Sequence, residues 1–266
     1  MNSLETASPR TPFEIQRAVV LALFVRELKT RFGRFRLGYF WALLEPMVGV
    51  AVLAVIWSAL RVKDFGGVPV VPFLVTGMVP FLFFTTAITS CLHAIAANQG
   101  LFNYRQVRPF DAIVTRILLE GIIYLAVYVA FLFVCWWVFD YEVWPHNLLM
   151  LLVVSTLLFL MAAGLAMAAS VAGSLFQEAA KLIPMLMRPL FFISGVIFPL
   201  FMLPDEYKAW LLWNPLLHAI ELSHVAFFAS FESPFVSFEY LGLCAVTSLA
   251  FGLTCLRANW QRMIST

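Results

Sequence analysis

The sequence predicts an all-α integral membrane protein with six transmembrane helices, an N-terminal amphipathic helix and a pair of short re-entrant helices. Of 266 residues, 62% are hydrophobic and 12% are charged, whereas a soluble domain has about 45–50% apolar and about 25% charged residues. The mean hydropathy is +0.91. Apolar runs long enough to cross a bilayer, which takes about 20 residues, recur along the chain. We therefore expect one membrane domain over residues 1–266 and no soluble domain.

The first element is a helix over residues 13–35 that lies on the membrane surface. Apolar residues recur there at helical spacing, and charged residues fall on the other faces. The apolar positions are Leu21, Phe24, Val25, Leu28, Phe32 and Phe35. The alternative is a simple stop-transfer flank.

Six later segments are apolar and long enough to span a bilayer. They cover residues 38–60, 70–97, 113–139, 148–176, 182–203 and 240–256. The stretch 204–228 is also apolar, but Pro215 breaks it and several charged residues interrupt it. Two short helices that enter the membrane and return fit this stretch better than a seventh span.

The distribution of basic residues predicts the orientation. With six spans, both termini lie on one side, and that side receives all but three of the 17 Lys and Arg residues. Arg61, Lys63 and Lys208 fall on the other side. Because Lys and Arg concentrate on the cytoplasmic side of membrane proteins, we expect both termini in the cytoplasm.

The chain lacks the sequence patterns of the common catalytic and nucleotide sites. The patterns G-x-x-x-x-G-K-[ST], G-x-S-x-G and H-E-x-x-H do not occur. We therefore predict no catalytic residue, no metal site and no cofactor in this chain, and energy for active transport must come from another subunit or an ion gradient. Arg116 and Glu120 lie four apart within a span and can pair on one helix face.

Three runs of sequence resemble the KpsM-type capsular polysaccharide export permeases, which are membrane subunits of ABC transporters. Residues 26–46 are RELKTRFGRFRLGYFWALLEP, residues 97–109 are ANQGLFNYRQVRP, and residues 211–223 are LLWNPLLHAIELS. The number and spacing of the spans also match that family over the whole chain. The resemblance implies a bacterial inner-membrane protein in which two copies of this chain assemble with two separate ABC ATPase subunits that bind ATP and Mg.

The resemblance further implies that residues 98–109 form a coupling helix seated on the ATPase. Phe102 and Tyr104 would act as anchors in a protein groove, and the arginines would pair with acidic groups at its rim. The residues assigned to ATPase coupling are Asn98, Leu101, Phe102, Tyr104, Arg105 and Arg108.

The substrate implied by the resemblance is a lipid-linked capsular polysaccharide, which periplasmic and outer-membrane export proteins would carry onward; no nucleic acid is expected. The residues assigned to the substrate entrance are Lys29, Arg31, Arg34, Arg36, Tyr39, Trp41 and Glu45. The basic members could instead serve only to set the orientation. The aromatic candidates for the channel wall are Tyr39, Trp41, Phe81, Phe83 and Phe84.

The stretch 204–228 resembles the periplasmic gate helices of the family. The gate residues are Trp213, Asn214, His218, Glu221 and His224. The last three, spaced three apart, could form a polar face at the water boundary, line an exit gate or, least favoured, hold a metal. The family often has arginine where this chain has His224, and a histidine there is expected to be charged part of the time near neutral pH.

Other functions remain open from the sequence. A permease of the same architecture could export another lipid-linked polymer, such as O-antigen or teichoic acid. A membrane-embedded glycosyl- or acyltransferase would need clustered acidic or histidine residues at one membrane face. A secondary transporter usually has internal repeats and buried ion ligands, which this sequence lacks.

Overall fold

The computed structural model describes residues 11–32, 38–102 and 106–265. Helices make up almost all of the regular structure. In chain order the elements are α1 (Pro12–Phe32), α2 (Gly38–Ala59), β1 (Asp64–Phe65), β2 (Val68–Pro69), α3 (Val70–Cys91), α4 (Ala94–Asn98), the 3-10 helix η1 (Gln99–Leu101), α5 (Pro109–Phe139), α6 (Leu148–Leu175), α7 (Ala179–Ile193), the 3-10 helix η2 (Leu200–Met202), α8 (Asp205–Leu211), α9 (Pro215–Phe227), α10 (Phe238–Ala258) and α11 (Trp260–Ser265).

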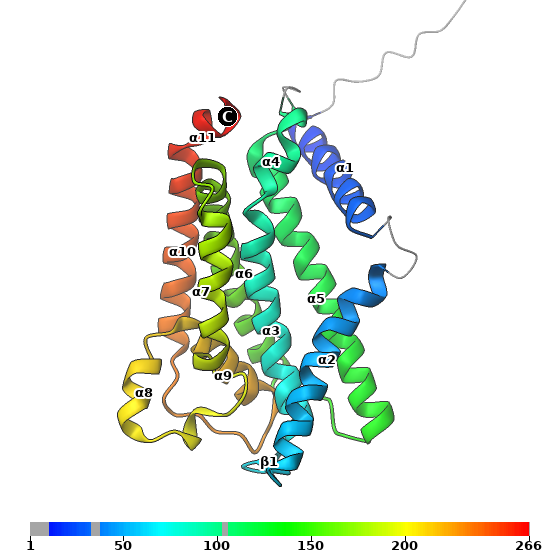
Figure 1. The fold of residues 1–266 in the computed structure, drawn as a ribbon, viewed down its shortest axis with the longest axis vertical. Helices are drawn as coiled ribbons and strands as arrows, with labels where there is room; N and C mark the ends of the chain where they lie inside the picture. The colour runs from blue at the N-terminus through cyan, green and yellow to red at the C-terminus, as the bar shows by residue number, and fades with distance from the viewer. Residues whose placement is uncertain (1–10, 33–37, 103–105, 266) are drawn as a thin grey trace, which may run out of the picture.

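A bundle of long apolar helices forms the centre of the molecule (Figure 1). Within the described residues, α3, α5, α6 and α10 are long and apolar enough to cross a membrane. Helix α3 is the most buried of these and contacts α2, α5, α6, α7 and α9. Helices α2 and α7 lie on either side of α3 in the view of Figure 1. The sequence-predicted membrane domain is therefore organised around α3.

Helices α6 and α10 share the most extensive helix–helix contact in the bundle. Glycines allow their backbones to meet: a Cβ on Gly164 would overlap the backbone of Ser248, and one on Gly252 would overlap the backbone of Gly164. Small residues at such crossings let transmembrane helices gain close packing contacts. The pair α6–α10 is thus held by close backbone packing, together with a hydrogen bond of 3.4 Å from the Ser248 hydroxyl to the Met161 carbonyl.

A short β-hairpin, which the sequence analysis did not predict, joins α2 to α3. Asp64 pairs with Pro69 and Phe65 with Val68 in antiparallel register. Gly66 and Gly67 have φ angles of 63° and 89°, as a tight two-residue hairpin turn requires. The Asp64 carboxylate accepts a hydrogen bond from the Gly67 N–H at 3.0 Å. The hairpin lies at the opposite end of the bundle from α4 (Figure 1).

Two predicted spans differ from the observed helices. The predicted helix 70–97 is broken after Cys91, and α4 begins at Ala94. Near this break, the Ser90 carbonyl accepts a hydrogen bond from Arg116 at 2.7 Å. The predicted helix 182–203 ends at Ile193, because Gly195 adopts a φ of 71° that a right-handed helix does not allow.

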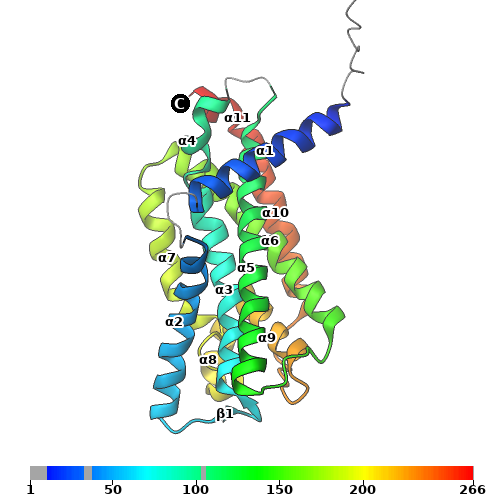
Figure 2. The ribbon, with the colours of Figure 1, turned by 90° about the vertical axis from the view of Figure 1, so that its right-hand side faces the viewer.

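The first and last helices lie at the same end of the bundle. Helix α1 crosses the outside of α5 near this end (Figures 1 and 2), and α4 and α11 also lie at this end, with α11 on the side away from α1 in Figure 1. Helices α8 and α9 occupy the part of the molecule nearer the hairpin (Figure 1). The short helix pair expected within residues 204–228 is thus present as α8 and α9.

Candidate functional site

A network of charged side chains fastens α1 to α5. Glu27 on α1 accepts hydrogen bonds from Nε and Nη2 of Arg116 on α5, both at 3.3 Å. One helical turn along α5, Glu120 is buried and forms an ion pair with Arg31 of α1. Arg116 and Glu120 could pair with each other by their spacing, but each finds an ion-pair partner on α1. Charges in an apolar helix need such partners because burying them unpaired is costly.

Asn98 connects this network to α4. Its amide nitrogen donates to the Ala94 carbonyl at 2.8 Å and to Glu27 Oε1 at 3.4 Å. Its amide oxygen accepts a hydrogen bond from Arg26 Nη2. Three helices are thus tied through polar side chains at one end of the bundle. We call this set the junction, and its members are Arg26, Glu27, Arg31, Asn98, Arg116 and Glu120.

The start of α1 is fixed to the start of α5 by a separate contact. Gln16 donates a side-chain hydrogen bond to Asp111, whose other carboxylate oxygen accepts the Arg108 backbone N–H at 2.9 Å. Asp111 therefore caps α5, which begins at Pro109 in the favourable first helical position. Helix α1 is held to α5 along most of its length.

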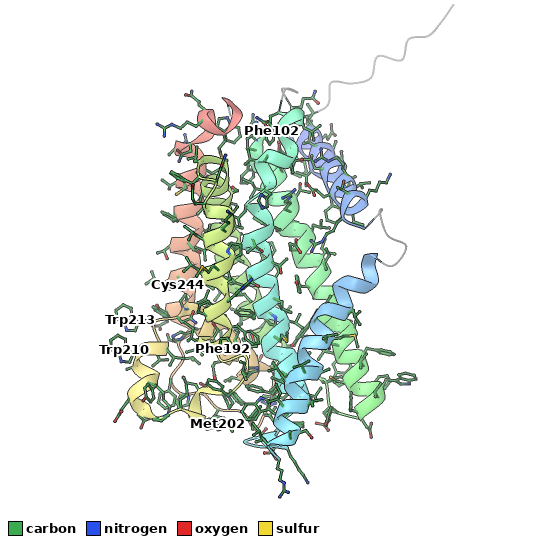
Figure 3. The ribbon with its side chains drawn as sticks, viewed as in Figure 1. Phe102, Phe192, Met202, Trp210, Trp213 and Cys244 are labelled. Atoms are coloured by element: carbon green, nitrogen blue, oxygen red, sulfur yellow. The ribbon has the colours of Figure 1, made fainter. Side chains whose placement is uncertain are left out.

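The residues assigned to ATPase coupling fall into distinct environments. Asn98 is buried within the junction, so it is not a surface contact. Leu101 and Phe102 are half-buried, and Phe102 packs on the bundle core at the α4 end of the molecule (Figure 3). Arg108 is exposed as the N-cap of α5. Tyr104 and Arg105 lie outside the described residues.

The entrance residues are described only in part. Lys29 is exposed on α1, and Arg31, although partly exposed, is paired with Glu120 of the junction. Arg34 and Arg36 lie outside the described residues. The remaining assigned residues fall in α2, but their side chains are outside the described part of the structure; these are Tyr39, Trp41 and Glu45.

The three phenylalanines suggested for the channel wall lie inside this chain's bundle. Phe81, Phe83 and Phe84 are all buried. Phe81 packs edge-on against Phe191, with ring centroids 5.2 Å apart, and Phe83 stacks on Phe159 at 5.8 Å. In this structure their contacts are with neighbouring helices.

The histidine nearest the start of α9 is held in one tautomer. His218 is buried, and its Nδ1 accepts the Ser237 backbone N–H at 3.0 Å. The proton therefore lies on Nε2, which donates to the Leu212 carbonyl at 2.9 Å. Burial lowers the pKa of His218, against the opposing effect of the Leu212 carbonyl. The neutral ring, with both nitrogens hydrogen-bonded, thus joins the start of α9 to Leu212 at the end of α8 and to Ser237 at the start of α10.

His224 is buried in an aromatic pocket and not in a polar face. Its ring stacks on Phe73 at a centroid distance of 4.1 Å and contacts Phe231 at 5.4 Å. Its Nε2 lies 3.2 Å from the Phe73 carbonyl oxygen, and the absence of a Cβ on Gly77 makes room for the ring. Burial lowers the pKa of His224 to about 3. The expectation that this histidine is partly charged near neutral pH is therefore wrong.

Glu221 lies between the two histidines in sequence but has its own buried environment. Its Oε1 accepts the Leu200 backbone N–H at 2.7 Å. Burial raises the pKa of Glu221 to about 7, and the Leu200 N–H and the Ser233 hydroxyl oppose that rise. The carboxyl group thus fastens α9 to the segment after α7. Within the described parts of the chain, no set of three His, Cys, Asp or Glu side chains is grouped to hold a metal ion.

The other two gate residues flank the start of α9. Asn214 caps α9 by accepting the Leu216 N–H at 3.0 Å, and its amide donates to Ser194 Oγ at 2.8 Å. Trp213 points outward near Trp210 (Figure 3), and both are exposed. The Trp213 carbonyl accepts the Tyr240 hydroxyl at 2.8 Å. Exposed tryptophans of this kind are typical of membrane–water interfaces.

Comparison with known proteins identifies the family. The ABC-2 type transporter profile matches residues 18–228. The polysialic acid transport protein KpsM of Escherichia coli is 40% identical over 97% of this chain and 99% of its own length. The capsule polysaccharide export inner-membrane protein CtrC of Neisseria meningitidis serogroup B is 28% identical over 95% of each chain. The O-antigen export system permease protein RfbA of Klebsiella pneumoniae is 22% identical over 84% of each chain.

These relatives are transport proteins, and the ATPase of such a transporter is a separate subunit. Together with the apolar helices, they make this chain a multi-pass membrane permease and not an enzyme. The resemblance to KpsM-type permeases is confirmed, and the chain belongs to the ABC-2 type transporter family.

Proposed function

We propose that this chain is the channel-forming permease subunit of an ATP-driven exporter that moves lipid-linked capsular polysaccharide across the bacterial inner membrane. The observation that carries this proposal is the 40% identity, over nearly the whole chain, to a protein named for polysialic acid transport. The O-antigen permease is only 22% identical over a smaller share. The capsule substrate is therefore better supported than O-antigen or teichoic acid.

In this proposal α2 and α7 join the four long helices to give six spans. Helix α7 has 15 residues and is about 22 Å long, which is less than the roughly 30 Å of a bilayer core. The apolar segment between Gly195 and Leu203 would complete the fifth crossing. The pair α8 and α9 would be the periplasmic re-entrant gate.

The proposed orientation places both termini in the cytoplasm. The arrangement of α1 and α11 at one end supports it, because an even number of crossings returns the chain to the side where it began (Figure 1). The basic residues of the sequence favour the same side. Two copies of the chain would form the channel, and two ATPase subunits with bound ATP and Mg would dock at this end.

The junction supports a specific route for coupling. An ATPase that displaces segment 98–109 would pull on Asn98, and Asn98 is bonded to Glu27 and Arg26 of α1. Glu27 in turn bonds Arg116 inside α5. Movement at the docking segment would therefore shift α1 and α5 together. Arg31 is paired with Glu120, so Lys29, which is exposed, is more available to an anionic substrate.

Deletion and complementation in the source bacterium test the proposal. Removing the gene for this chain should abolish surface capsule, and the wild-type gene should restore it. O-antigen is measured on the same cells as the control for the alternative polymer. Loss of O-antigen with intact capsule would reject the capsule assignment in favour of the O-antigen alternative.

A further inference from the structure

A basic cleft opens at the α1 end of the molecule, between the start of α5 and the end of α10. Its volume is about 930 Å³. The cleft lies apart from the junction and from α9, and it shares only Arg108 with the residues assigned to ATPase coupling. The residues that line it are Gln16, Arg108, Phe110, Asp111, Leu253, Leu256, Arg257, Ala258, Trp260, Gln261 and Arg262.

Three arginines give the cleft a positive charge. Arg108 comes from the start of α5, whereas Arg257 and Arg262 come from α10 and α11 on the other wall. Asp111 is the acidic residue of the lining, and its carboxylate oxygens accept hydrogen bonds from Gln16 and from the Arg108 backbone. In the parts of the chain that the structure describes, Arg108 and Arg257 form no salt bridge with a carboxylate. Guanidinium groups match the geometry and charge of phosphate.

Apolar side chains of two long membrane helices form another part of the cleft lining. Phe110 and Leu253 are 36% and 43% exposed and lie in α5 and α10, both of which are long and apolar enough to cross a bilayer. Trp260 begins α11 directly beyond the end of α10, a position that interfacial tryptophans often take. Basic and apolar surfaces therefore meet within one cleft at a helix end.

This combination distinguishes among anionic ligands. A soluble anion would use only the arginines, and an acidic protein rim would leave the apolar wall uncovered. A phospholipid provides a phosphate for the arginines and acyl chains for the wall, and basic pockets between transmembrane helices are known to take anionic head groups. We propose that the cleft binds an anionic glycerophospholipid, with its phosphate between Arg108 and Arg257 and its acyl chain along Phe110 and Leu253.

The test uses the full-length chain purified in detergent. Binding of dioleoyl-phosphatidylglycerol is measured by native mass spectrometry and by the rise in thermal stability, with dioleoyl-phosphatidylcholine as the neutral lipid. We expect the wild type to prefer the anionic lipid and R108Q/R257Q to bind it at least about tenfold more weakly, because charge-assisted contacts to phosphate are lost. R108K/R257K should retain part of the affinity.

The matched control removes the same charge at the same end of the bundle. Arg17 and Lys181 are exposed and do not line the cleft, so R17Q/K181Q should bind the lipid as the wild type does. If the double glutamine variant aggregates, R257Q alone provides the measurement, since Arg257 is exposed near the end of α10.

Three results would overturn the proposal. Equal loss of affinity in R17Q/K181Q would mean that lipid binding follows net charge only. Equal stabilisation by inorganic phosphate would indicate an anion site without a lipid. Unchanged lipid binding in R108Q/R257Q, with loss of a co-purifying ATPase, would make the cleft a protein docking surface.

Discussion

Glu27 on α1 is hydrogen-bonded to both Nε and Nη2 of the Arg116 guanidinium in the apolar helix α5, at 3.3 Å. Each side chain is 14% exposed. Because Arg116 also donates to the Ser90 carbonyl at the end of α3, one guanidinium joins α1, α3 and α5. This arrangement connects α1 to the core of the membrane domain.

Removing the charge of Glu27 should destabilise the protein. In Glu27→Gln the largely buried guanidinium of Arg116 loses its counter-charge from α1. The expected loss in the free energy of unfolding is about 2 kcal/mol or more. Thermal unfolding in detergent measures it, with exposed Arg17→Gln on the same helix as the control. A double-mutant cycle with Arg116→Gln should give a clear coupling energy, and purely additive effects would show that the pair contributes nothing.

Asn98 should transmit motion and not bind the ATPase. Asn98→Leu keeps the branched shape of the side chain but removes the hydrogen bonds to Arg26 and Glu27, so we expect the ATPase to co-purify normally while capsule export falls several-fold. Gln99→Ala is the control, because Gln99 is the exposed next residue. Loss of co-purification in Asn98→Leu would instead make this side chain part of the docking surface.

His224 should make the protein sensitive to acid. A histidine whose pKa is lower in the folded protein than in the unfolded chain stabilises the fold above pH 6.5, and that stability is lost as the pH falls. With a folded pKa of about 3, the loss at pH 5 is about 2 kcal/mol. His224→Phe should therefore flatten the fall of melting temperature between pH 7 and pH 5, whereas exposed His93→Gln should not.

Glu221 changes the stability of the fold with pH in the opposite direction to His224. The effect of His224 must therefore be measured by comparing the pH profiles of the variant and the wild type. Its pKa is raised to about 7 in the folded protein, so its contribution is complete below about pH 4.5 and is lost as the pH rises through 7. The dependence of wild-type stability on pH is the sum of the contributions of both groups. If His224→Phe and the wild type have parallel profiles below pH 6.5, the buried histidine is not the acid-sensitive group.

The α6–α10 contact should tolerate no added methyl group at its centre. Gly164→Ala places a Cβ against the Ser248 backbone, and such overpacking costs about 1–3 kcal/mol. Gly242→Ala lies on α10 with no atom within 4 Å of the new Cβ among the described residues, so its melting temperature should stay near that of the wild type. An unchanged melting temperature in Gly164→Ala would mean that the two backbones can separate without loss of stability.

The hydropathy of the sequence determined the membrane class, the positions of the long helices and the pair of short helices at 204–228. Those features depend on local composition and on the roughly 20 residues that a bilayer requires. The motifs at 26–46, 97–109 and 211–223 determined the family, which the matching profile and relatives confirmed. The hairpin at Asp64–Pro69 was missed because two-residue strands leave almost no periodic signal.

Partner choice among the polar residues was decided only by the tertiary structure. The spacing of Arg116 and Glu120 allowed a pair within α5, but α1 crosses that face and supplies Glu27 and Arg31. The spacing of His218, Glu221 and His224 allowed a shared polar face, but each packs against a different segment of the chain. Sequence spacing fixes which residues share a helix face, whereas the pairing and protonation of a side chain depend on what the rest of the fold places beside it.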